Sequence, residues 1–266
     1  MPDMQFVKCE IEKNGVANVI LNRPKVHNAF NEVMIAELTS TFERLAEDKH
    51  VRLAVMRGEG PSFCAGADLE WMRKMKNYSM DENVEDSRKM AVMYHNLNEF
   101  PKPLIGQVHG AAIGGGLGLV AACDYVVAAL DTRFALSEVR LGLVPAVVSP
   151  FVIAKIGETE ARARFLSGEP FNAEAARRMG LIHEEVVDYA ILTMKMQSVI
   201  NSFLKAGPEA AMEAKRLIAN LMGHKREAVM DYTCRLIARM RVTDEAQEGM
   251  DALLNKRQPN WIKPRK

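Results

Sequence analysis

Two stretches of small residues could hold a negatively charged oxygen with backbone groups alone. FCAGADLEW, residues 63–71, runs from a small-residue turn into an expected helix, and HGAAIGGGLGLVAACD, residues 109–124, does the same. The first N–H groups of a helix have no partner inside it, and the helix dipole favours negative charge at that end. If two such ends meet, their N–H groups form an oxyanion hole, and small residues let a ligand carbonyl approach closely.

The glycines of the second stretch also have a purely structural interpretation. Gly114 to Gly116 and Gly118 could serve only to let a strand and a helix pack tightly, because glycine-rich turns are common. No GK[ST] follows them, so the stretch is not a Walker loop, and the GxGxxG dinucleotide pattern fits only loosely. The glycines alone therefore leave both an oxyanion hole and a packing role open.

The other reactive side chains give weaker signals. The four cysteines, Cys9, Cys64, Cys123 and Cys234, are scattered without a CxxC pair, so no metal site is expected and free thiols are favoured. Cys64 lies in the first small-residue stretch, but no partner base is identifiable, which favours a small buried cysteine over a nucleophile. His109, just before the glycines, is expected to be a structural imidazole.

Alternating strands and helices are expected to position the two stretches. FVKCEIEK and VANVILN flank Asn14-Gly15 and predict a β-hairpin. Asn31 is expected to cap a helix, and VRLAVMRG and PLIGQVHG predict strands, each just before one of the two small-residue stretches. A helical region is expected at about residues 69–98, and the pattern is helical from about residue 187 onward. The alternation predicts an α/β fold with a helical C-terminal extension.

Composition narrows the class of protein. The chain has 266 residues, of which 48% are hydrophobic and 26% charged, as in ordinary globular proteins. Lys plus Arg number 35 and Asp plus Glu 34, and this balance argues against a nucleic-acid surface. The chain contains no run of eighteen apolar residues, so no membrane span is expected. The N-terminal residues show no signal core or presequence, so a cytoplasmic location is expected.

Several motifs, in order along almost the whole chain, resemble the enoyl-CoA hydratase/isomerase (crotonase) family. The matching segments are ILNRPKVHNAFN, MRGEGPSFCAGADL, KPLIGQVHGAAIGGGLGLVAACD, RFALSEVRLGLVP, AARRMGLIHEEVV and DEAQEGMDALLNKRQPNW. The resemblance implies a crotonase-like ββα spiral core with a CoA-thioester site over residues 1–195. It also implies a helical trimerisation region over residues 196–266, and thus a homotrimer or a dimer of trimers.

The resemblance also implies which groups carry the chemistry. The backbone N–H groups of Ala67 and Gly115 would bind the thioester oxygen, which gains negative charge in an enolate-like state. Family hydratases generally carry two glutamates that hold a water, but here the first position is Gly118, and only the second is retained, as Glu138. Glu138 would therefore act as the lone acid/base, and burial beside an acyl chain is expected to raise its pKa.

A lone glutamate suits more than one function. It could take a proton from water and deliver one to C2 of an enoyl thioester, or it could carry a proton between C2 and C4 in an isomerase. A third interpretation is a protein that binds acyl-CoA without turnover, or RNA through the tail QPNWIKPRK. ADLEWMRKM and SEVRLGLVPAVVSPFV resemble the methylglutaconyl-CoA hydratase-like branch of leucine catabolism, which favours hydration of that or a related branched substrate.

The resemblance assigns the remaining site residues to a CoA path and an acyl pocket. The CoA path comprises Lys25, Val26, Asn28, Ala65, Gly66, Asp68 and Leu69. The acyl pocket comprises Trp71, Met72, Gly118, Val144 and Pro145. CoA is part of the substrate, so no separate cofactor is expected, and neither is a membrane or nucleic-acid partner.

Further cations have hypothetical roles. Arg23, with Lys25, could meet the CoA phosphates, and Arg73 or Lys74 could pair with a distal carboxylate of the acyl group. In the C-terminal tail, Lys256 or Lys263 could reach the CoA of a neighbouring subunit.

Overall fold

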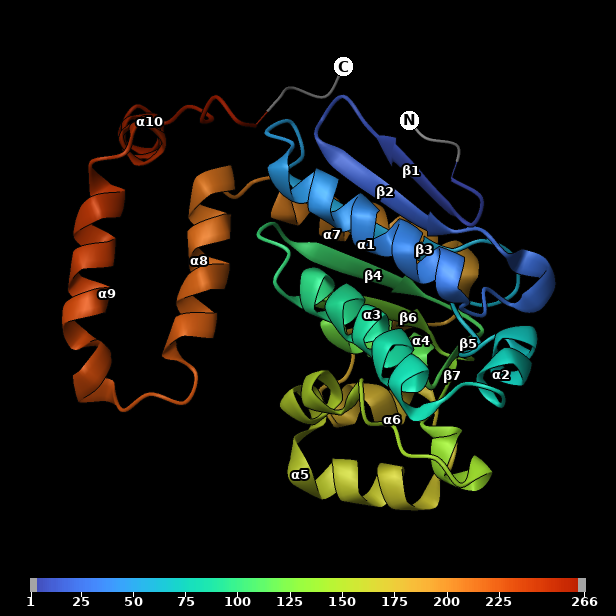
Figure 1. Ribbon diagram of the computed structural model, residues 1–266. Coiled ribbons are helices and arrows are strands. Elements are labelled where there is room, and N and C mark those ends of the chain that lie inside the picture. Colours follow the sequence, from blue (N-terminus) through green and yellow to red (C-terminus); the bar gives the residue numbers. More distant parts are fainter. Residues whose placement is uncertain (1–3, 263–266) are drawn as a thin grey trace. The chain divides into compact units, whose positions relative to one another are not determined.

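The computed structural model describes residues 4–262. Its largest sheet has six strands (Figure 1). In sheet order its strands are β1 (Val7–Ile11), β2 (Val16–Leu21), β3 (Leu53–Gly58), β4 (Leu104–Val108), β6 (Tyr125–Ala129) and β8 (Glu184–Val186). β1 and β2 are antiparallel, and every other neighbouring pair is parallel. β5 (Ala111–Ile113) and β7 (Arg133–Ala135) form a second, parallel sheet.

The N-terminal hairpin and the first helix confirm the local sequence signals. Val7 pairs with Leu21 across β1 and β2, and the turn places Gly15 at φ 88°, a left-handed conformation that favours glycine. The Asn31 side chain accepts a hydrogen bond from the Met34 amide and so caps α1 (Glu32–Glu47).

Helices cover the sheet, and α1 packs against α3 on the side that faces the viewer in Figure 1. After α1 the helices are α2 (Leu69–Met75), α3 (Met80–Asn98), α4 (Gly115–Ala122), α5 (Ser149–Ser167), α6 (Ala173–Arg178) and α7 (Tyr189–Phe203). Short 3-10 helices span Pro24–Val26 (η1) and Ser137–Leu141 (η2). The helical region expected at about residues 69–98 consists of α2 and α3, and a capping box formed by Ser79 and Glu82 begins α3.

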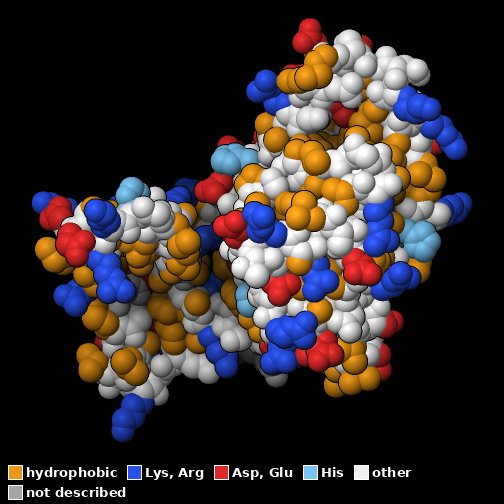
Figure 2. Space-filling view, turned by 90° about the horizontal axis from the view of Figure 1, so that it is seen from below, with side chains coloured by type: hydrophobic (Ala, Val, Ile, Leu, Met, Phe, Trp, Pro, Cys, Tyr) orange, Lys and Arg blue, Asp and Glu red, His pale blue; other side chains and the backbone are white. Residues whose placement is uncertain are grey.

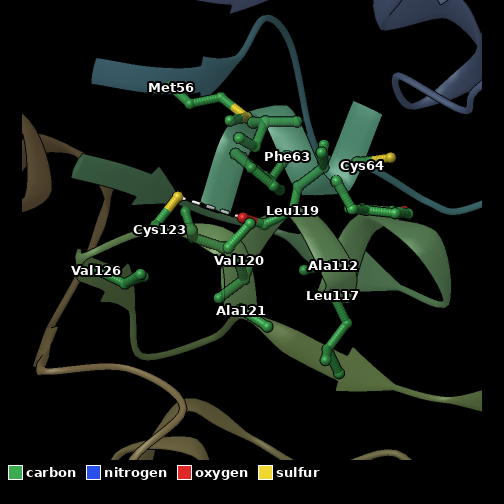
Figure 3. Packing of buried hydrophobic residues seen from close by; sticks show 14 of the residues in the cluster. Met56, Phe63, Cys64, Ala112, Leu117, Leu119, Val120, Ala121, Cys123 and Val126 are labelled. Carbon is green, nitrogen blue, oxygen red and sulfur yellow. Dashed lines mark hydrogen bonds between the residues drawn. The ribbon is translucent and has the colours of Figure 1, made fainter. Parts of the chain in front are cut away.

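The glycine-rich helix α4 lies inside the hydrophobic core. Figure 3 shows Leu117, Leu119 and Val120 of this helix among buried side chains from neighbouring elements. At its end the Cys123 thiol donates to the Leu119 carbonyl at 3.3 Å. Every residue of the adjacent strand β4 is also buried, as in parallel sheets covered on both faces. The position of α4 is therefore fixed by packing against the elements around it.

A second compact unit comprises Ser198–Lys266 together with Pro101–Pro103. Its helices are α8 (Pro208–Leu221), α9 (Arg226–Arg241) and α10 (Asp244–Leu254). The unit boundary, between residues 197 and 198, and the boundary expected from sequence, between 195 and 196, both fall inside α7.

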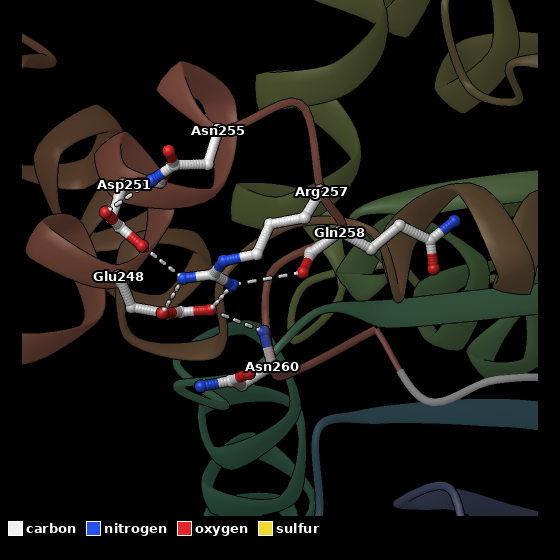
Figure 4. A network of polar contacts seen from close by, with 6 residues as sticks. All are labelled: Glu248, Asp251, Asn255, Arg257, Gln258 and Asn260. Carbon is white, nitrogen blue, oxygen red and sulfur yellow. Dashed lines mark hydrogen bonds and ion pairs between the residues drawn. The ribbon is translucent and has the colours of Figure 1, made fainter.

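Arg257 ties the chain after α10 back onto that helix (Figure 4). Its guanidinium donates to both carboxylate oxygens of Glu248, at 2.6 and 2.7 Å, and to Asp251 at 2.5 Å. The hydrogen bonds from Arg257, together with one from the Asn260 amide, lower the pKa of Glu248 to about 2. The bidentate pair fixes the direction in which the chain leaves α10.

The second unit exposes many apolar side chains. Figure 2 shows hydrophobic side chains on the surface of the lobe at the left. The large ones that are more than half exposed in this unit are Ile218, Met222, Met230, Ile237, Val242, Leu253 and Leu254. The trimerisation role of this unit stays a prediction. Lys256 lies in the unit at φ 52°, whereas Lys263 lies outside the described residues.

Surface charge is mixed on the face seen in Figure 2, where Lys and Arg side chains are interspersed with Asp and Glu. Within residues 4–262, no helix combines the length and the apolar character needed to cross a bilayer.

Candidate active site

The two small-residue stretches of the sequence run side by side. The Cys64 amide donates to the Ala111 carbonyl at 2.9 Å, and the Ile113 amide donates to the Cys64 carbonyl at 3.0 Å, so Cys64 and Ala112 form a parallel bridge. A Cβ on Gly116 would lie 2.4 Å from the Cys64 carbonyl oxygen. Only glycine permits this contact, so the backbones can approach because of the residue types in both stretches.

This pairing brings the two expected oxyanion donors to one place. Ala67 and Gly115 each lie three residues beyond the bridged pair Cys64 and Ala112, and both border the same cavity. Within residues 4–262, neither backbone N–H donates a hydrogen bond to another group of the protein. Gly115 is the first residue of α4, so its N–H has no partner within the helix. Both donors are free for a ligand.

The cavity that these amides border has a volume of about 410 Å³. Nine residues predicted from the sequence form part of its wall, namely Ala65, Gly66, Ala67, Trp71, Met72, Gly115, Glu138, Val144 and Pro145. The wall is mainly apolar, which suits an acyl chain next to a polar reaction centre.

Glu138 places its carboxyl group beside the glycine turn. It lies in η2, just after β7, and its Oε1 would be 3.0 Å from a Cβ built on Gly114. Gly114 has φ 52°, and the following residue is the oxyanion candidate Gly115. The Oε2 atom of Glu138 is buried without a hydrogen-bond partner, and burial raises the pKa of this carboxyl. The structure thus has an acid/base group with an unused oxygen near a free amide.

The raised pKa of Glu138 is expected to make the stability of the folded protein depend on pH. Because the folded state holds this proton at a pH where the unfolded chain has lost it, stability falls as pH rises from the unfolded pKa through the folded pKa. Glu138→Gln is therefore expected to raise the thermal unfolding midpoint at about pH 8, with the gain shrinking toward about pH 4. Calorimetric scans across this range measure the difference, and a gain that grew on acidification would contradict the assignment.

Gly118 does not line the cavity, which corrects its assignment to the acyl pocket. A Cβ at this position would lie 2.5 Å from the Val148 Cγ1 and 2.9 Å from the Tyr94 Cε1. Tyr94 is fully buried, and its hydroxyl donates to the Gly115 carbonyl at 2.7 Å. The place where family hydratases are expected to carry a second glutamate is thus filled by a valine and a tyrosine.

Two residues of the expected CoA path are engaged within the protein. The Asn28 side chain donates to the Glu59 and Ser62 carbonyls at 2.9 and 2.7 Å and accepts from the Arg23 amide, so its polar atoms hold the loop. Asp68 caps α2 and forms an ion pair with the Arg23 guanidinium at 2.8 Å, so neither is free for a phosphate.

The remaining expected CoA contacts lie on the surface. Lys25, Val26 and Leu69 are exposed and outside the cavity wall, so their contact with CoA stays a prediction. Arg73 and Lys74 also lie outside the wall, and Lys74 is held by Glu32 at 2.5 Å. The hypothesis that one of them pairs with a distal carboxylate therefore gains no support from their positions.

Helix α3 contributes wall residues that the sequence alone did not identify, namely Asp86, Ser87 and Met90. A signal for them existed. Asp86 and Met90 share the helical stripe that continues through Tyr94 and Leu97, and these last two residues are fully buried. Asp86 is the acidic residue on this otherwise apolar stripe, and it lies where the stripe reaches the cavity.

Neither Cys64 nor His109 has the environment of a catalytic group. Burial raises the pKa of the Cys64 thiol to about 12, which suppresses the thiolate. The His109 ring Nε2 lies 2.8 Å from the Gly60 carbonyl, as expected of a structural imidazole. In the described part of the chain, no group of three or more His, Cys, Asp or Glu side chains has the arrangement of a metal site.

Known proteins with similar sequences show the family to which the chain belongs. Residues 11–264 match the model of the family described as "Enoyl-CoA hydratase/isomerase". A 2,3-dehydroadipyl-CoA hydratase from Escherichia coli is 31% identical over 242 residues, covering 91% of this chain and 92% of that protein. These matches extend over both compact units.

Solved structures agree with the sequence comparison. An enoyl-CoA hydratase from Shewanella pealeana has a TM-score of 0.93 at 37% identity, covering 97% of each chain. AtuE of Pseudomonas aeruginosa has a TM-score of 0.94 at 30% identity, covering 97% of this chain and all of that one. With its crotonase fold and the match over nearly its full length, the chain belongs to the enoyl-CoA hydratase/isomerase family.

Proposed function

We propose that this chain is an enoyl-CoA hydratase that adds water across the 2,3 double bond of an enoyl-CoA thioester, with Glu138 as its only catalytic carboxyl group. The observation that supports this most strongly is the Glu138 carboxyl, with one unpartnered buried oxygen, in the same cavity wall as the free amides of Ala67 and Gly115. The enoyl-CoA hydratases among its relatives support the same class of reaction.

In the proposed reaction the thioester oxygen accepts hydrogen bonds from the Ala67 and Gly115 amides. Water attacks C3 as the Glu138 carboxylate takes its proton, and the π electrons of the double bond move onto the thioester as an enolate. The same carboxyl then protonates C2, which restores the carbonyl and the free carboxylate. Each amide donor is expected to stabilise the enolate-like transition state by about 3–4 kcal/mol, as in comparable oxyanion holes.

Isomerisation is a second candidate, and a specific observation favours it. Val148 and Tyr94 fill the space at Gly118, so no second carboxylate orients a water there. A Δ3,Δ2-enoyl-CoA isomerase needs no water. Glu138 would remove a proton from C2 of a 3-enoyl thioester and return it to C4, with the same two amides binding the enolate oxygen.

Ultraviolet absorbance of the conjugated enoyl thioester distinguishes these functions. Mixing the protein with crotonyl-CoA is expected to remove the absorbance, because hydration destroys the conjugation. Appearance of that absorbance from a 3-enoyl-CoA would instead support the isomerase. If neither changes while calorimetry shows a thioester bound, the protein is a non-catalytic acyl-CoA binder.

The finer assignments made from sequence remain proposals. Methylglutaconyl-CoA, or a related branched thioester of leucine catabolism, is the substrate that the sequence resemblance favours. A relative is a 2,3-dehydroadipyl-CoA hydratase, so a distal carboxylate belongs in the substrate screen. We also propose assembly as a trimer or a dimer of trimers through the exposed apolar side chains of α8 to α10, and a cytoplasmic location.

A further inference from the structure

The cavity has a polar end that the proposed reaction does not use. Trp71 of α2 and Asp86 of α3 both form part of the wall. Trp71 is only 3% exposed, and its indole Nε1–H is buried without a hydrogen-bond partner. Burial raises the pKa of the Asp86 carboxyl, which lies close enough to this N–H for the indole to lower that pKa by a smaller amount, but the contact does not meet hydrogen-bond geometry. A buried donor left unpaired is destabilising, and a ligand that supplies an acceptor removes this penalty.

Asp86 lies away from the reaction centre. It precedes Tyr94 by eight residues on α3, a distance of about 12 Å along a helix. The charge of Glu138 affects the pKa of Tyr94, whereas the charges that affect the pKa of Asp86 are those of Lys89 and Glu32. Asp86 is therefore not the missing second acid of the reaction. We assign Asp86 to the part of the cavity that would receive the far end of an acyl chain.

No cation balances Asp86 within the cavity wall. Among the described residues, the charged side chains of this wall are Asp86 and Glu138, and no Lys, Arg or His lines it. The ammonium of Lys74 is bound to Glu32 outside the wall. A carboxylate at the end of an acyl chain would thus meet a second carboxylate in a partly desolvated site, which is unfavourable.

We infer that Trp71 and Asp86 select enoyl-CoA thioesters whose acyl chain ends in an uncharged hydroxyl group, and that they disfavour a distal carboxylate. A hydroxyl oxygen accepts the Trp71 Nε1–H while the hydroxyl proton is donated to the Asp86 carboxylate. A ketone oxygen could accept from the Trp71 indole but donate nothing to Asp86. An ammonium could donate to Asp86 but accept nothing from Trp71, and a methyl group could do neither. The inference rests on the proposed function in one respect only, namely that the acyl chain of a CoA thioester occupies this cavity. It argues against methylglutaconyl-CoA as the preferred substrate, because that thioester carries a distal carboxylate.

The test uses three 2-enoyl-CoA thioesters of matched chain length, repeated over several lengths: an unsubstituted chain, its ω-hydroxy analogue and its ω-carboxylate analogue. For the wild type we expect kcat/KM for the ω-hydroxy thioester to exceed that for the ω-carboxylate by about tenfold or more at the best length. Trp71→Phe is expected to lower the preference for ω-hydroxy over unsubstituted substrate about tenfold, because it removes the indole donor. Asp86→Asn is expected to raise the relative rate with the ω-carboxylate.

Asp81→Asn, on an exposed position of the same helix, is the matched control and should leave all three ratios unchanged. Because Asp86 is only partly buried, its variant tests the inference even if Trp71→Phe fails to fold. Equal rates with the two ω-substituted thioesters in the wild type, or unchanged ratios in Asp86→Asn, would overturn the inference. If hydration itself is not observed, calorimetric Kd values for the same thioesters on the Glu138→Gln protein measure the same preference as a ratio of affinities.

Discussion

Glu138→Gln is expected to lower kcat for the preferred enoyl thioester by about 10²–10⁴-fold, the range that positioned acid/base groups contribute. Glutamine keeps the size of the side chain but can neither accept the proton of water nor deliver one to C2. The two amide donors, from Ala67 and Gly115, are backbone groups and remain in place. The thioester should therefore still bind with nearly unchanged Kd. Stopped-flow absorbance for turnover and calorimetry for binding measure the two quantities separately.

Glu169→Gln is the matched control, because this glutamate is exposed and lies outside the cavity wall. It is expected to retain the wild-type kcat. A Glu138→Gln protein that kept more than about a tenth of the wild-type kcat would show that another group moves the proton. If Glu138→Gln lost both thioester binding and turnover, Glu138 would contribute to substrate binding and not only to the transfer of the proton.

Substitution of Gly118 is expected to lower stability. Its Cβ would lie 2.5 Å from Val148 and 2.9 Å from Tyr94, both buried. Overpacking of this kind costs about 1–3 kcal/mol, which outweighs the gain of about 1 kcal/mol that alanine offers over glycine in a helix. Gly118→Ala should therefore lower the free energy of unfolding in urea. Gly118→Glu, which restores the family glutamate, should lose more stability and gain no hydratase activity.

The double variant Gly118→Ala/Val148→Ala serves as the control for this explanation. Removing the valine methyl groups vacates the space that the new Cβ needs, so the double variant should be more stable than the sum of the two single changes predicts. Additive losses would mean that the contact with Val148 is not the cause. A stable Gly118→Glu protein with faster hydration would mean that α4 and α5 separate readily at this point.

Local signals in the sequence were sufficient for much of the fold. Asn31 caps α1, and Asn14-Gly15 turns the first hairpin, because both effects depend only on neighbouring backbone groups. Between residues 69 and 98 the pattern correctly predicted helix, but it did not show the break before Ser79, whose capping box begins α3. The boundaries of helices and strands were thus predicted correctly where a cap or turn residue stood at the point where the hydrophobic periodicity changed.

The site shows the same division. The sequence indicated that two small-residue stretches each lead into a helix, and its resemblance to the family assigned Glu138 as the acid/base group. It assigned Gly118 to the acyl pocket, and it missed Asp86. The positions of Gly118 and Asp86 relative to the cavity depend on which side of their helices faces it. The elements packed against each helix determine that side. Val148, thirty residues after Gly118 in the chain, occupies the space next to it.

The sequence by itself determined the class of fold, the caps and turns, and the presence of backbone groups able to bind an oxyanion, because these follow from residue types and their spacing. Only the tertiary structure decided that Ala67 and Gly115 border one cavity, that Glu138 lies against Gly114, and that Trp71 retains an unpaired donor. The physical reason is that burial and desolvation are properties of surfaces that meet. A carboxyl or an indole acquires an unusual environment only when segments distant in sequence exclude water from it.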